Sequence, residues 1–530
     1  MKNDNHRRFK VSARDFSGNV PVRSCFYPLF LLFLFSSPLL SPDSLLAREA
    51  KLTILFTNDH HGQVETVSES DPSKPIGGVT RRMALIEKIR QEVGPKSVLL
   101  VDGGDLFTGT ALSGLTNGEV DCAAYQLMKY DAIVLGNHDF DYGKKSILEF
   151  QKKFAIPWVS ANAVVRLNSQ NFVRPYVLKY AGVRVGMIGF SNPTTPQLTR
   201  RENVSGLIFN PPGASAKGLH SILKKDADLF IALSHLGVDE DKKFAKDNPF
   251  LQIIIGGHTH TLLLEPIVDK RKDGSLAGPL ITQAGSRGLY LGRLDLTLEG
   301  HRDPKTRKEE YHIADYHYQL IPITANLPED PSMVELLEKY KAKFKAQGLD
   351  DTLVTVMEDF SRSEKGDSML GEITADAIRT AAHAEVALVN SGAFRSDLHA
   401  GSLTRSDLYE LYPFDDAVVV LDIPGIYLRK AIEASWQKKG EGAFLQVSGM
   451  KIDAKGGSLK IQVGTEPLSD RRKYRVAVND FLSEGGDGYD LFRRIKSRKK
   501  TTLMARDLLE EALKTKQKIS SGNLEKRWDF

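Results

Sequence analysis

Residues 52–62 read Leu-Thr-Ile-Leu-Phe-Thr-Asn-Asp-His-His-Gly. The apolar run Leu52–Phe56 is typical of a buried β-strand, and it leads directly into a polar segment. Asp59 and His61 in that segment are residue types that bind divalent metal ions. The stretch therefore predicts a strand that carries metal ligands at its carboxyl end.

The same arrangement recurs four more times in the first half of the chain. Apolar runs at 98–101, 132–135, 229–233 and 253–255 each lead into a polar segment. The candidate ligands beyond the five runs are Asp59, His61, Asp105, Asn137, His235, His258 and His260. In an open α/β sheet, ligands collect beyond the carboxyl ends of the strands. We therefore expect one sheet edge to gather these side chains into a site for two metal ions.

The residue types in this set suit a pair of metal ions. Two divalent cations about 3.5–4 Å apart need a shared anionic bridge and mixed oxygen and nitrogen ligands. Asp105 is the expected bridge, because its strand would be central in the sheet and a carboxylate can span two ions. The other ligands divide into two sets: Asp59, His61 and one of His258 and His260; Asn137, His235 and the other histidine.

Each segment taken alone has a second interpretation. Asp-x-His and His-x-His also occur in amidohydrolase-type metal sites, and a single histidine after a strand is more often a structural residue. Asn137-His138-Asp139 would also suit a turn. Five such segments after five strands favour the metal site.

The motifs resemble those of a known family. Residues 57–62, 103–105, 136–141, 234–235 and 256–260 are similar to the metal-binding motifs of the calcineurin-like metallophosphoesterases. Within that superfamily the chain resembles the secreted 5′-nucleotidase and bacterial UDP-sugar hydrolase family. The motifs that carry this closer resemblance are Asn-Ser-Gly-Ala-Phe-Arg at 390–395, Tyr-Pro-Phe at 412–414 and Asn-Asp-Phe-Leu-Ser-Glu-Gly-Gly-Asp-Gly-Tyr at 479–489.

The resemblance implies an α/β fold with two domains. A four-layer metallophosphoesterase sandwich domain would be followed by a smaller α/β nucleotide-binding domain, with a linker helix between them. Alternating strand-like and helical runs over 51–325 independently favour a layered α/β domain. A break at Pro322–Pro331 precedes an expected helix over 332–346. The expected division is a signal peptide (1–47), a phosphoesterase domain (48–325), a linker helix and hinge (326–350) and a nucleotide-binding domain (351–530).

Two residues next to the metal ligands have an implied catalytic role. By resemblance, Asp141 orients His138, whose imidazole would stabilise the phosphoryl charge or assist the leaving oxygen. A histidine held in one tautomer by a carboxylate is a common acid–base or electrostatic element. The alternative is that Asp141 caps a helix that begins near Tyr142, since Asp is a favoured N-cap.

The second half is expected to bind the substrate. By resemblance, Phe414 and Phe481 sandwich a nucleobase and Asp487 holds the ribose hydroxyls. The further binding residues that the family motifs imply are Arg362, Asn390, Gly392 and Arg395. The family commonly has Gly or Asn after the Pro-Phe pair, whereas this chain has Asp415-Asp416. The base preference is therefore left open.

The N-terminus differs from the rest of the chain. Six basic residues precede the apolar run Phe26–Leu40, and the small residue Ala47 follows it. This pattern is typical of a secretory signal peptide, and the run is shorter than the ~20 apolar residues of a membrane span. An uncleaved anchor is the alternative, but after cleavage we expect no stable membrane span.

Composition narrows the range of partners. Residues 1–47 contain six Lys or Arg and three Asp, so their removal lowers the net charge from +5 to about +2. We therefore expect a small nucleotide as the partner and no nucleic acid polymer. Only Cys122 remains outside the signal, so stability must come from packing rather than from an internal disulfide.

The expected function is that of a secreted hydrolase. Metal-bound hydroxide would attack nucleoside 5′-monophosphates in line and release phosphate. UDP-sugar hydrolysis, or 2′,3′-cyclic-nucleotide 2′-phosphodiesterase and 3′-nucleotidase activity, are the alternatives within the superfamily. A catalytically silent nucleotide-binding surface protein is the alternative from another class. The cofactors would be two divalent ions, zinc or manganese with cobalt or iron as alternatives, and the location periplasmic or extracellular.

Overall fold

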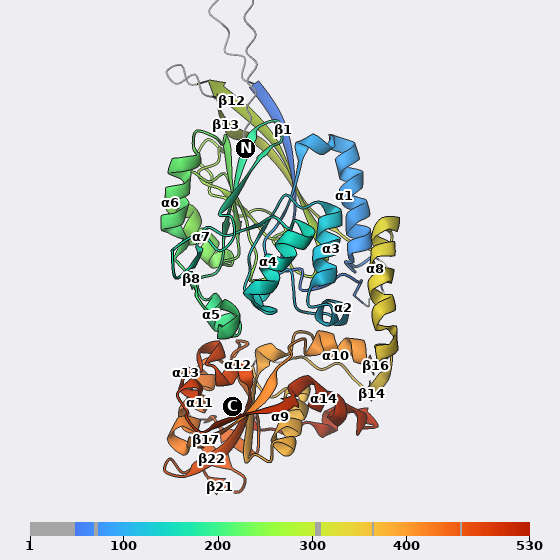
Figure 1. The fold of residues 1–530 in the computed structure, drawn as a ribbon, viewed down its shortest axis with the longest axis vertical. Helices are drawn as coiled ribbons and strands as arrows, with labels where there is room; N and C mark the ends of the chain where they lie inside the picture. Colours follow the sequence, from blue (N-terminus) through green and yellow to red (C-terminus); the bar gives the residue numbers. More distant parts are fainter. Residues whose placement is uncertain (1–47, 68–70, 72, 303–308, 363–364, 456–457) are drawn as a thin grey trace, which may run out of the picture. The chain divides into compact units, whose positions relative to one another are not determined.

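The computed structural model describes residues 48–67, 71, 73–302, 309–362, 365–455 and 458–530, and Figure 1 shows their path. The predicted signal peptide, residues 1–47, lies outside the described residues. Within the described part of the chain, no helix is long and apolar enough to cross a membrane.

Two sheets form the centre of the first half. The first has the order β13-β12-β1-β2-β3-β4, and the second β11-β10-β9-β7-β6. The strands of the first are β1 (Arg48–Thr57), β2 (Val98–Asp102), β3 (Ala132–Val134), β4 (Trp158–Val159), β12 (Tyr290–Arg302) and β13 (Glu309–Pro322). The strands of the second are β6 (Tyr176–Tyr180), β7 (Arg184–Phe190), β9 (Leu229–Ser234), β10 (Ile253–Ile255) and β11 (Leu280–Thr282). In both sheets the strands that carry candidate ligands pair in parallel.

The expectation of one sheet edge for all five ligand-bearing strands is wrong. Three of these strands, β1, β2 and β3, belong to the first sheet, whereas β9 and β10 belong to the second. The apolar runs could not reveal this division, because the runs that carry the ligands are buried on both faces in either sheet and lack a polar side.

Alternating side chains show how the layers are stacked. Ile54 and Phe56 on β1 pack between the two sheets, against Met187 and Ile231 of the second sheet. Leu55, which points the other way, packs into a core formed with helices such as α1. The helices that cover the first sheet are α1 (Val79–Val93), α3 (Glu119–Met128) and α4 (Gly143–Phe154), and those on the second are α6 (Pro212–Leu223) and α7 (Val238–Asp247). The layers helix–sheet–sheet–helix, visible in Figure 1, confirm the predicted sandwich.

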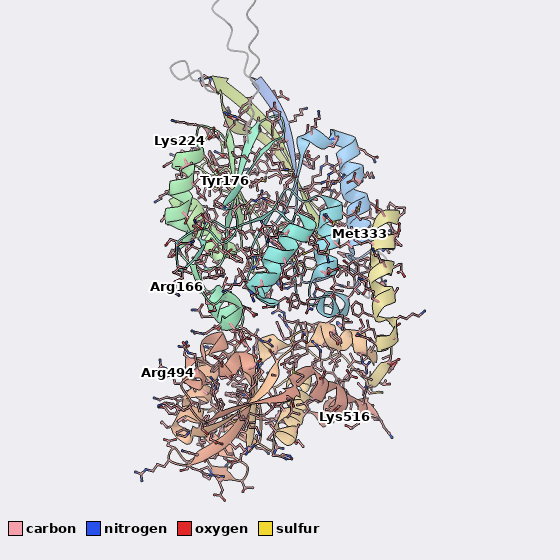
Figure 2. The ribbon with its side chains drawn as sticks, in the orientation of Figure 1. Arg166, Tyr176, Lys224, Met333, Arg494 and Lys516 are labelled. Atoms are coloured by element: carbon pink, nitrogen blue, oxygen red, sulfur yellow. The ribbon has the colours of Figure 1, made fainter. Side chains whose placement is uncertain are left out.

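The predicted helix over 332–346 is α8 (Pro331–Phe344). The carboxylate of Asp330 accepts hydrogen bonds from the backbone N–H groups of Ser332 (2.9 Å) and Met333 (3.0 Å), which caps the helix start. Met333, labelled in Figure 2, is fully buried in the core that α8 shares with α1 and α3.

A second α/β unit follows α8. Its main sheet has the order β18-β15-β22-β17-β23, with α9 (Met369–Ala381) and α14 (Ala505–Lys514) on one face and α11 (Gly425–Gln437) on the other. The strands are β15 (Val386–Asn390), β17 (Ala417–Pro424), β18 (Leu445–Ser448), β22 (Lys473–Asn479) and β23 (Arg498–Met504). We propose residues 48–325, 326–350 and 351–530 as the two domains and the linker between them. The first internal limit falls between β13 and α8, and the second between α8 and β14 (Thr352–Val356).

The remaining elements are short. The small sheets contain β5 (Ala163–Val165), β8 (Leu207–Phe209), β16 (Gly401–Thr404), β19 (Met450–Asp453), β20 (Lys460–Val463), β21 (Glu466–Pro467), β24 (Lys518–Ile519) and β25 (Trp528–Asp529). The short helices are α2 (Ala111–Leu115), α5 (Thr195–Leu198), α10 (Arg405–Leu411), α12 (Asp480–Ser483) and α13 (Asp490–Arg493). Of these, α5 and α12 lie next to residues of the candidate site.

Candidate active site

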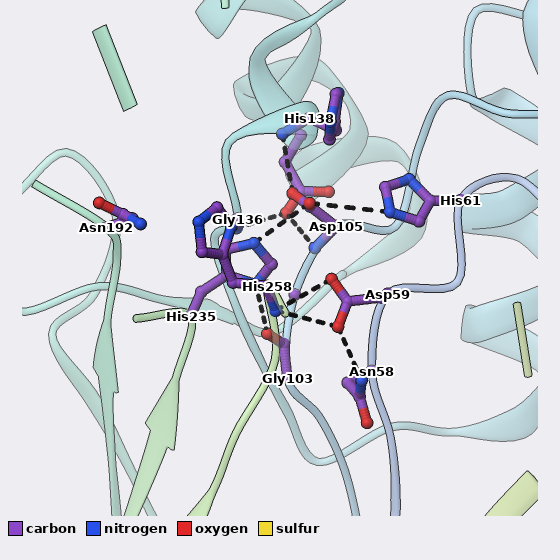
Figure 3. A network of polar contacts seen from close by, with 12 residues as sticks. Asn58, Asp59, His61, Gly103, Asp105, Gly136, His138, Asn192, His235 and His258 are labelled. Carbon is purple, nitrogen blue, oxygen red and sulfur yellow. Dashed lines mark hydrogen bonds and ion pairs between the residues drawn. The ribbon is translucent and has the colours of Figure 1, made fainter. Parts of the chain in front are cut away.

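The structure brings the predicted metal ligands together beyond the strand ends (Figure 3). One group consists of Asp59, His61 and His260, whose ligand atoms all lie within 4.8 Å of one another. In it, Nε2 of His260 is 2.9 Å from Nε2 of His61 and 3.5 Å from Oδ1 of Asp59. The assignment of the histidine pair, which the sequence left open, therefore places His260 with Asp59 and His61.

The second group consists of Asp105, His235 and His258, again within 4.8 Å. Oδ2 of Asp105 is 3.1 Å from Nε2 of His235 and 3.9 Å from Nε2 of His61 in the first group. Asp105 thus lies between the two groups, where a bridging carboxylate is needed. Asn137 lines the same cavity, and its buried Oδ1 has no hydrogen-bond partner within the described part of the chain.

Hydrogen bonds on the far side of two imidazoles show that the site suits cations. Nδ1 of His235 donates to the carbonyl oxygen of Gly103 (2.7 Å), and Nδ1 of His61 donates to that of Thr108 (3.1 Å). Since a carbonyl can only accept, Nδ1 carries a proton, which leaves Nε2 as the ring atom that can bind a cation. Nε2 of His235 is buried and faces Oδ2 of Asp105 at 3.1 Å, and imidazole nitrogens beside carboxylates form a donor set that fits a pair of divalent cations.

The loops that present the ligands have an unusual backbone. Five ligand candidates have a positive φ: Asp59 (50°), His61 (50°), Asp105 (57°), His258 (77°) and His260 (52°). This left-handed conformation is uncommon outside glycine and concentrates at functional sites. Gly104 (φ 92°) is required for a different reason, because a Cβ there would lie 2.8 Å from Nδ1 of His235 and 2.9 Å from the carbonyl oxygen of Val134.

The charges of the cluster shift one another's pKa. Burial raises and the neighbouring imidazoles lower the pKa of Asp105, and the net result is a pKa well below its usual range. Burial opposes protonation of His235, but Asp105 outweighs it and raises the pKa to about 10. For His258, burial and the nearby His235 lower the pKa to about 4.

Asp139 supports the Asp105 loop and was missed by the sequence reasoning. Its carboxylate accepts hydrogen bonds from the backbone N–H groups of Asp105 (3.2 Å), Leu106 (2.8 Å) and Gly136 (2.7 Å). Burial, with the charge of Asp105, raises its pKa to about 7. The only sequence signal for this role is that Asp139 directly follows the ligand candidate Asn137 and His138. Its three hydrogen-bond partners lie 3 to 34 residues away, so the sequence does not reveal them.

His138 and Asp141 are in contact. Nδ1 of His138 is 2.7 Å from Oδ2 of Asp141, while Oδ1 of Asp141 accepts a hydrogen bond from the hydroxyl of Thr199 (2.9 Å). Burial opposes protonation of His138, but Asp141 and Asp105 outweigh it and raise its pKa. The helix-cap interpretation of Asp141 is wrong, because α4 has Tyr142 as its N-cap and no side-chain cap.

One cavity of about 570 Å³ connects the metal ligands to the predicted substrate residues. Its lining includes all seven residues that the resemblance implied: Arg362, Asn390, Gly392, Arg395, Phe414, Phe481 and Asp487. Phe414 lies close to His138, with ring centroids 6.0 Å apart. The cavity also has lining residues near α5 that the sequence did not mark, among them Thr199, Arg200 and Asn203.

Two of the substrate residues are tied to each other. The amide of Asn390 donates to Oδ2 of Asp487 (2.8 Å), and burial raises the pKa of Asp487 to about 6. Arg395 is half-buried near the metal ligands. Its charge contributes, after burial and His260, to the lowered pKa of His61. The cavity therefore has a cationic group close to the metal side and polar groups farther along the second domain.

Comparisons with known proteins agree with this geometry. Residues 52–262 match the calcineurin-like phosphoesterase family, and residues 349–494 match the 5′-nucleotidase C-terminal domain. The UshA protein of Yersinia enterocolitica is 28% identical over 90% of this chain and 94% of its own. The 5′-nucleotidase of Vibrio cholerae is also 28% identical, over 83% of this chain and 86% of its own. The crystal structure of a 5′-nucleotidase precursor from Thermus thermophilus has a TM-score of 0.79 and 30% identity, covering 91% of this chain and 99% of that one.

The fold and the site define a metallophosphoesterase, an enzyme class that uses divalent metal ions to hydrolyse phosphoric esters. The chain belongs to the 5′-nucleotidase family within that class, because both domain families are present and the Thermus thermophilus structure matches over nearly its whole length.

Proposed function

We propose that this protein hydrolyses nucleoside 5′-monophosphates to nucleosides and inorganic phosphate. The cavity carries the proposal, because metal-ligand candidates line one side and Phe414, Phe481 and Asp487 line another. A ligand with a phosphate at one end and a flat base at the other suits such a lining. Relatives named 5′-nucleotidase support the same substrate class.

The proposed ligands divide as the geometry groups them. One cation would be held by Asp59, His61, His260 and Asp105, and the other by Asp105, Asn137, His235 and His258. Two such ions supply charge neutralisation at the phosphoryl group and activation of water. We propose zinc or manganese, since both accept mixed carboxylate and imidazole ligands.

The side chains around the ions then orient the substrate. His138, held by Asp141, lies beside Asp105 and would stabilise the phosphoryl charge or assist the leaving oxygen. Arg395 and Arg362 would bind the phosphate from the second domain. Stacking of a base between Phe414 and Phe481 would contribute roughly 1–3 kcal/mol. Gly392 would leave room beside Asn390, and Asp487 would accept hydrogen bonds from the ribose.

Phosphate release by the purified protein tests the proposal. The substrates AMP, UDP-glucose and 2′,3′-cyclic AMP are each assayed in the presence of zinc or manganese. Wild type is compared with Asp105→Asn and with the control Asp239→Asn, which removes an exposed carboxylate on α7. We expect metal-dependent turnover of AMP that is lost only in Asp105→Asn. Preference for UDP-glucose or the cyclic nucleotide would replace the proposed substrate. A folded, metal-loaded protein without turnover would be a silent nucleotide-binding protein.

We also propose that the protein is exported to the periplasm or the cell exterior. The N-terminal sequence supports this, with its basic segment, apolar run and Ala47. N-terminal sequencing of protein recovered from the producing cells and their medium tests it, and a chain that begins at Met1 inside the cell would contradict it.

The linker helix at 326–350 is proposed as a hinge between the domains.

A further inference from the structure

Arg200 connects the loops that carry both aromatic rings of the cavity. Its Nη2 lies 3.0 Å from Oδ1 of Asp416, donates to the carbonyl oxygen of Asp415, and lies 3.4 Å from Oδ1 of Asp480. Asp415 directly follows Phe414, and Asp480 directly precedes Phe481. One guanidinium from the metallophosphoesterase domain therefore lies where the two ring-bearing loops meet.

The acidic partners of Arg200 leave its other nitrogens available. Asp416 is buried, and its second oxygen already accepts hydrogen bonds from the hydroxyl of Tyr412 (2.9 Å) and the amide of Asn479 (3.1 Å). Asp416 thus has no oxygen left for a ligand. Arg200 lines the cavity, and among the described residues its Nε and Nη1 have no hydrogen-bond partner. The cavity wall beside the rings therefore offers N–H donors.

We propose that Arg200 selects the base, with a preference for 6-oxopurine nucleotides (GMP and IMP) over AMP. The inference rests on the proposed function and adds the base to it. A base between Phe414 and Phe481 would have its edge within reach of a residue anchored to both ring loops. Aspartates at 415 and 416, where the family commonly has Gly or Asn, are what hold the guanidinium there.

The chemistry of the guanidinium decides between the bases. Nη2 of Arg200 already donates to Asp415 and Asp416, and each parallel pair of guanidinium donors includes Nη2, so the base meets single N–H donors from Nε or Nη1. Such a donor pairs with O6 of guanine, and hypoxanthine has the same acceptor. Adenine has an amino group at position 6, so two donors would face each other and one would remain unpaired. A polar group left unpaired in a binding site gives strong discrimination. We expect about tenfold, the lower end of the effect of one hydrogen bond that involves a charged group.

The test uses an adjacent arginine as a matched control. Arg201 also forms an ion pair with the second domain, with Nη2 2.9 Å from Oδ1 of Asp490, but it does not line the cavity. We compare kcat/KM for GMP, IMP and AMP in four proteins: wild type, Arg200→Gln, Arg200→Lys and Arg201→Gln. Binding of guanosine and adenosine is measured by calorimetry on the same metal-loaded proteins. Turnover of p-nitrophenyl phosphate reports whether each variant keeps a working metal centre.

The expected result is a GMP-to-AMP ratio of about ten or more in wild type and Arg201→Gln, and about one in Arg200→Gln. Arg200→Lys should recover only part of the ratio, because a single ammonium nitrogen cannot both hold the two aspartates and present a separate, fixed donor to the base. Equal use of GMP and AMP by wild type would overturn the inference, as would an equal change in both glutamine variants. Wild type could hydrolyse no nucleotide and still bind guanosine more tightly than adenosine. If Arg200→Gln then binds the two nucleosides equally, the proposed function fails while the role of Arg200 in base selection stands.

Discussion

The imidazole of His138 and the carboxylate of Asp141 are joined by a contact of 2.7 Å, and the other carboxylate oxygen is held by Thr199. The chain Thr199–Asp141–His138 fixes the imidazole plane beside Asp105. Thr199 precedes Arg200, so adjacent residues contact the proposed catalytic pair and the ring-bearing loops. The segment after α5 therefore links both ends of the cavity.

Replacement of Asp141 by Asn should lower kcat for AMP by about 100-fold, the lower end of the effect of a positioned acid–base group. The amide can no longer hold His138 with a negative charge, although the side chain keeps its size. Thr199→Val should have a smaller effect in the same direction, and Thr199→Ser should restore most of the rate. Steady-state kinetics measure both. Unchanged kcat in Asp141→Asn would show that the pair has no catalytic role.

Removal of the metal ions should both inactivate and destabilise the protein. A chelator would leave Asp105, His235 and the left-handed ligand loops without the cations that hold them, and ligands that bind only the folded state raise its stability. We expect a lower thermal midpoint after chelation and recovery of midpoint and activity with zinc or manganese. In Asp105→Asn the metal should produce a much smaller shift. Equal metal-induced shifts in both proteins would argue against a bridging Asp105.

The sequence predicted the parts of the site that follow strands and left out the parts held by long-range contacts. Asp59 and His61 were predictable because they end an apolar run, and the structure places them in one group. The choice between His258 and His260 depended on loop conformation, since both have a positive φ that no neighbouring residue signals. Arg200 was not predictable, because it belongs to no recognised motif and its partner Asp416, which the sequence did mark, lies 216 positions away.

The division into two sheets was unpredictable for a related reason. Ile54 and Leu55 are both fully buried, one between the sheets and the other under the helices. A strand buried on both faces has no polar side to indicate its partner layer. The order of the strands along the chain could be predicted, whereas the assignment of β9 and β10 to a separate sheet required the structure.

Glu372, which does not line the active-site cavity, should make the free energy of unfolding depend on pH. Burial raises its pKa to about 7, and its Oε2 accepts a hydrogen bond from the backbone of Glu525 (2.8 Å). Because the folded pKa exceeds the unfolded one, this group stabilises the fold at low pH and loses that contribution as pH rises towards 7. Glu372→Gln keeps the acceptor and cannot ionise. Its stability relative to wild type should therefore rise by up to about 3 kcal/mol between pH 4.5 and pH 8.

Urea unfolding of both proteins across that pH range measures the difference. Other titrating groups are common to the two proteins, so their contributions cancel. A difference that does not change with pH would mean that the Glu372 carboxylate ionises as easily in the folded protein as in the unfolded chain.

Gly104 should tolerate no side chain beside the metal centre. Its φ of 92° disfavours any side chain, and a Cβ would meet His235 and the backbone of Val134 at less than 3 Å. Gly94 has nearly the same φ (89°) but nothing within 4 Å of the added carbon. Gly94→Ala therefore measures the strain of a positive φ without a clash, which should cost about 1–3 kcal/mol. Gly104→Ala should cost more and should also weaken zinc binding, because the methyl group displaces the imidazole of His235. Urea unfolding and zinc titration of the two variants separate these effects; equal losses of stability with unchanged zinc affinity would show that the loop relaxes without moving His235.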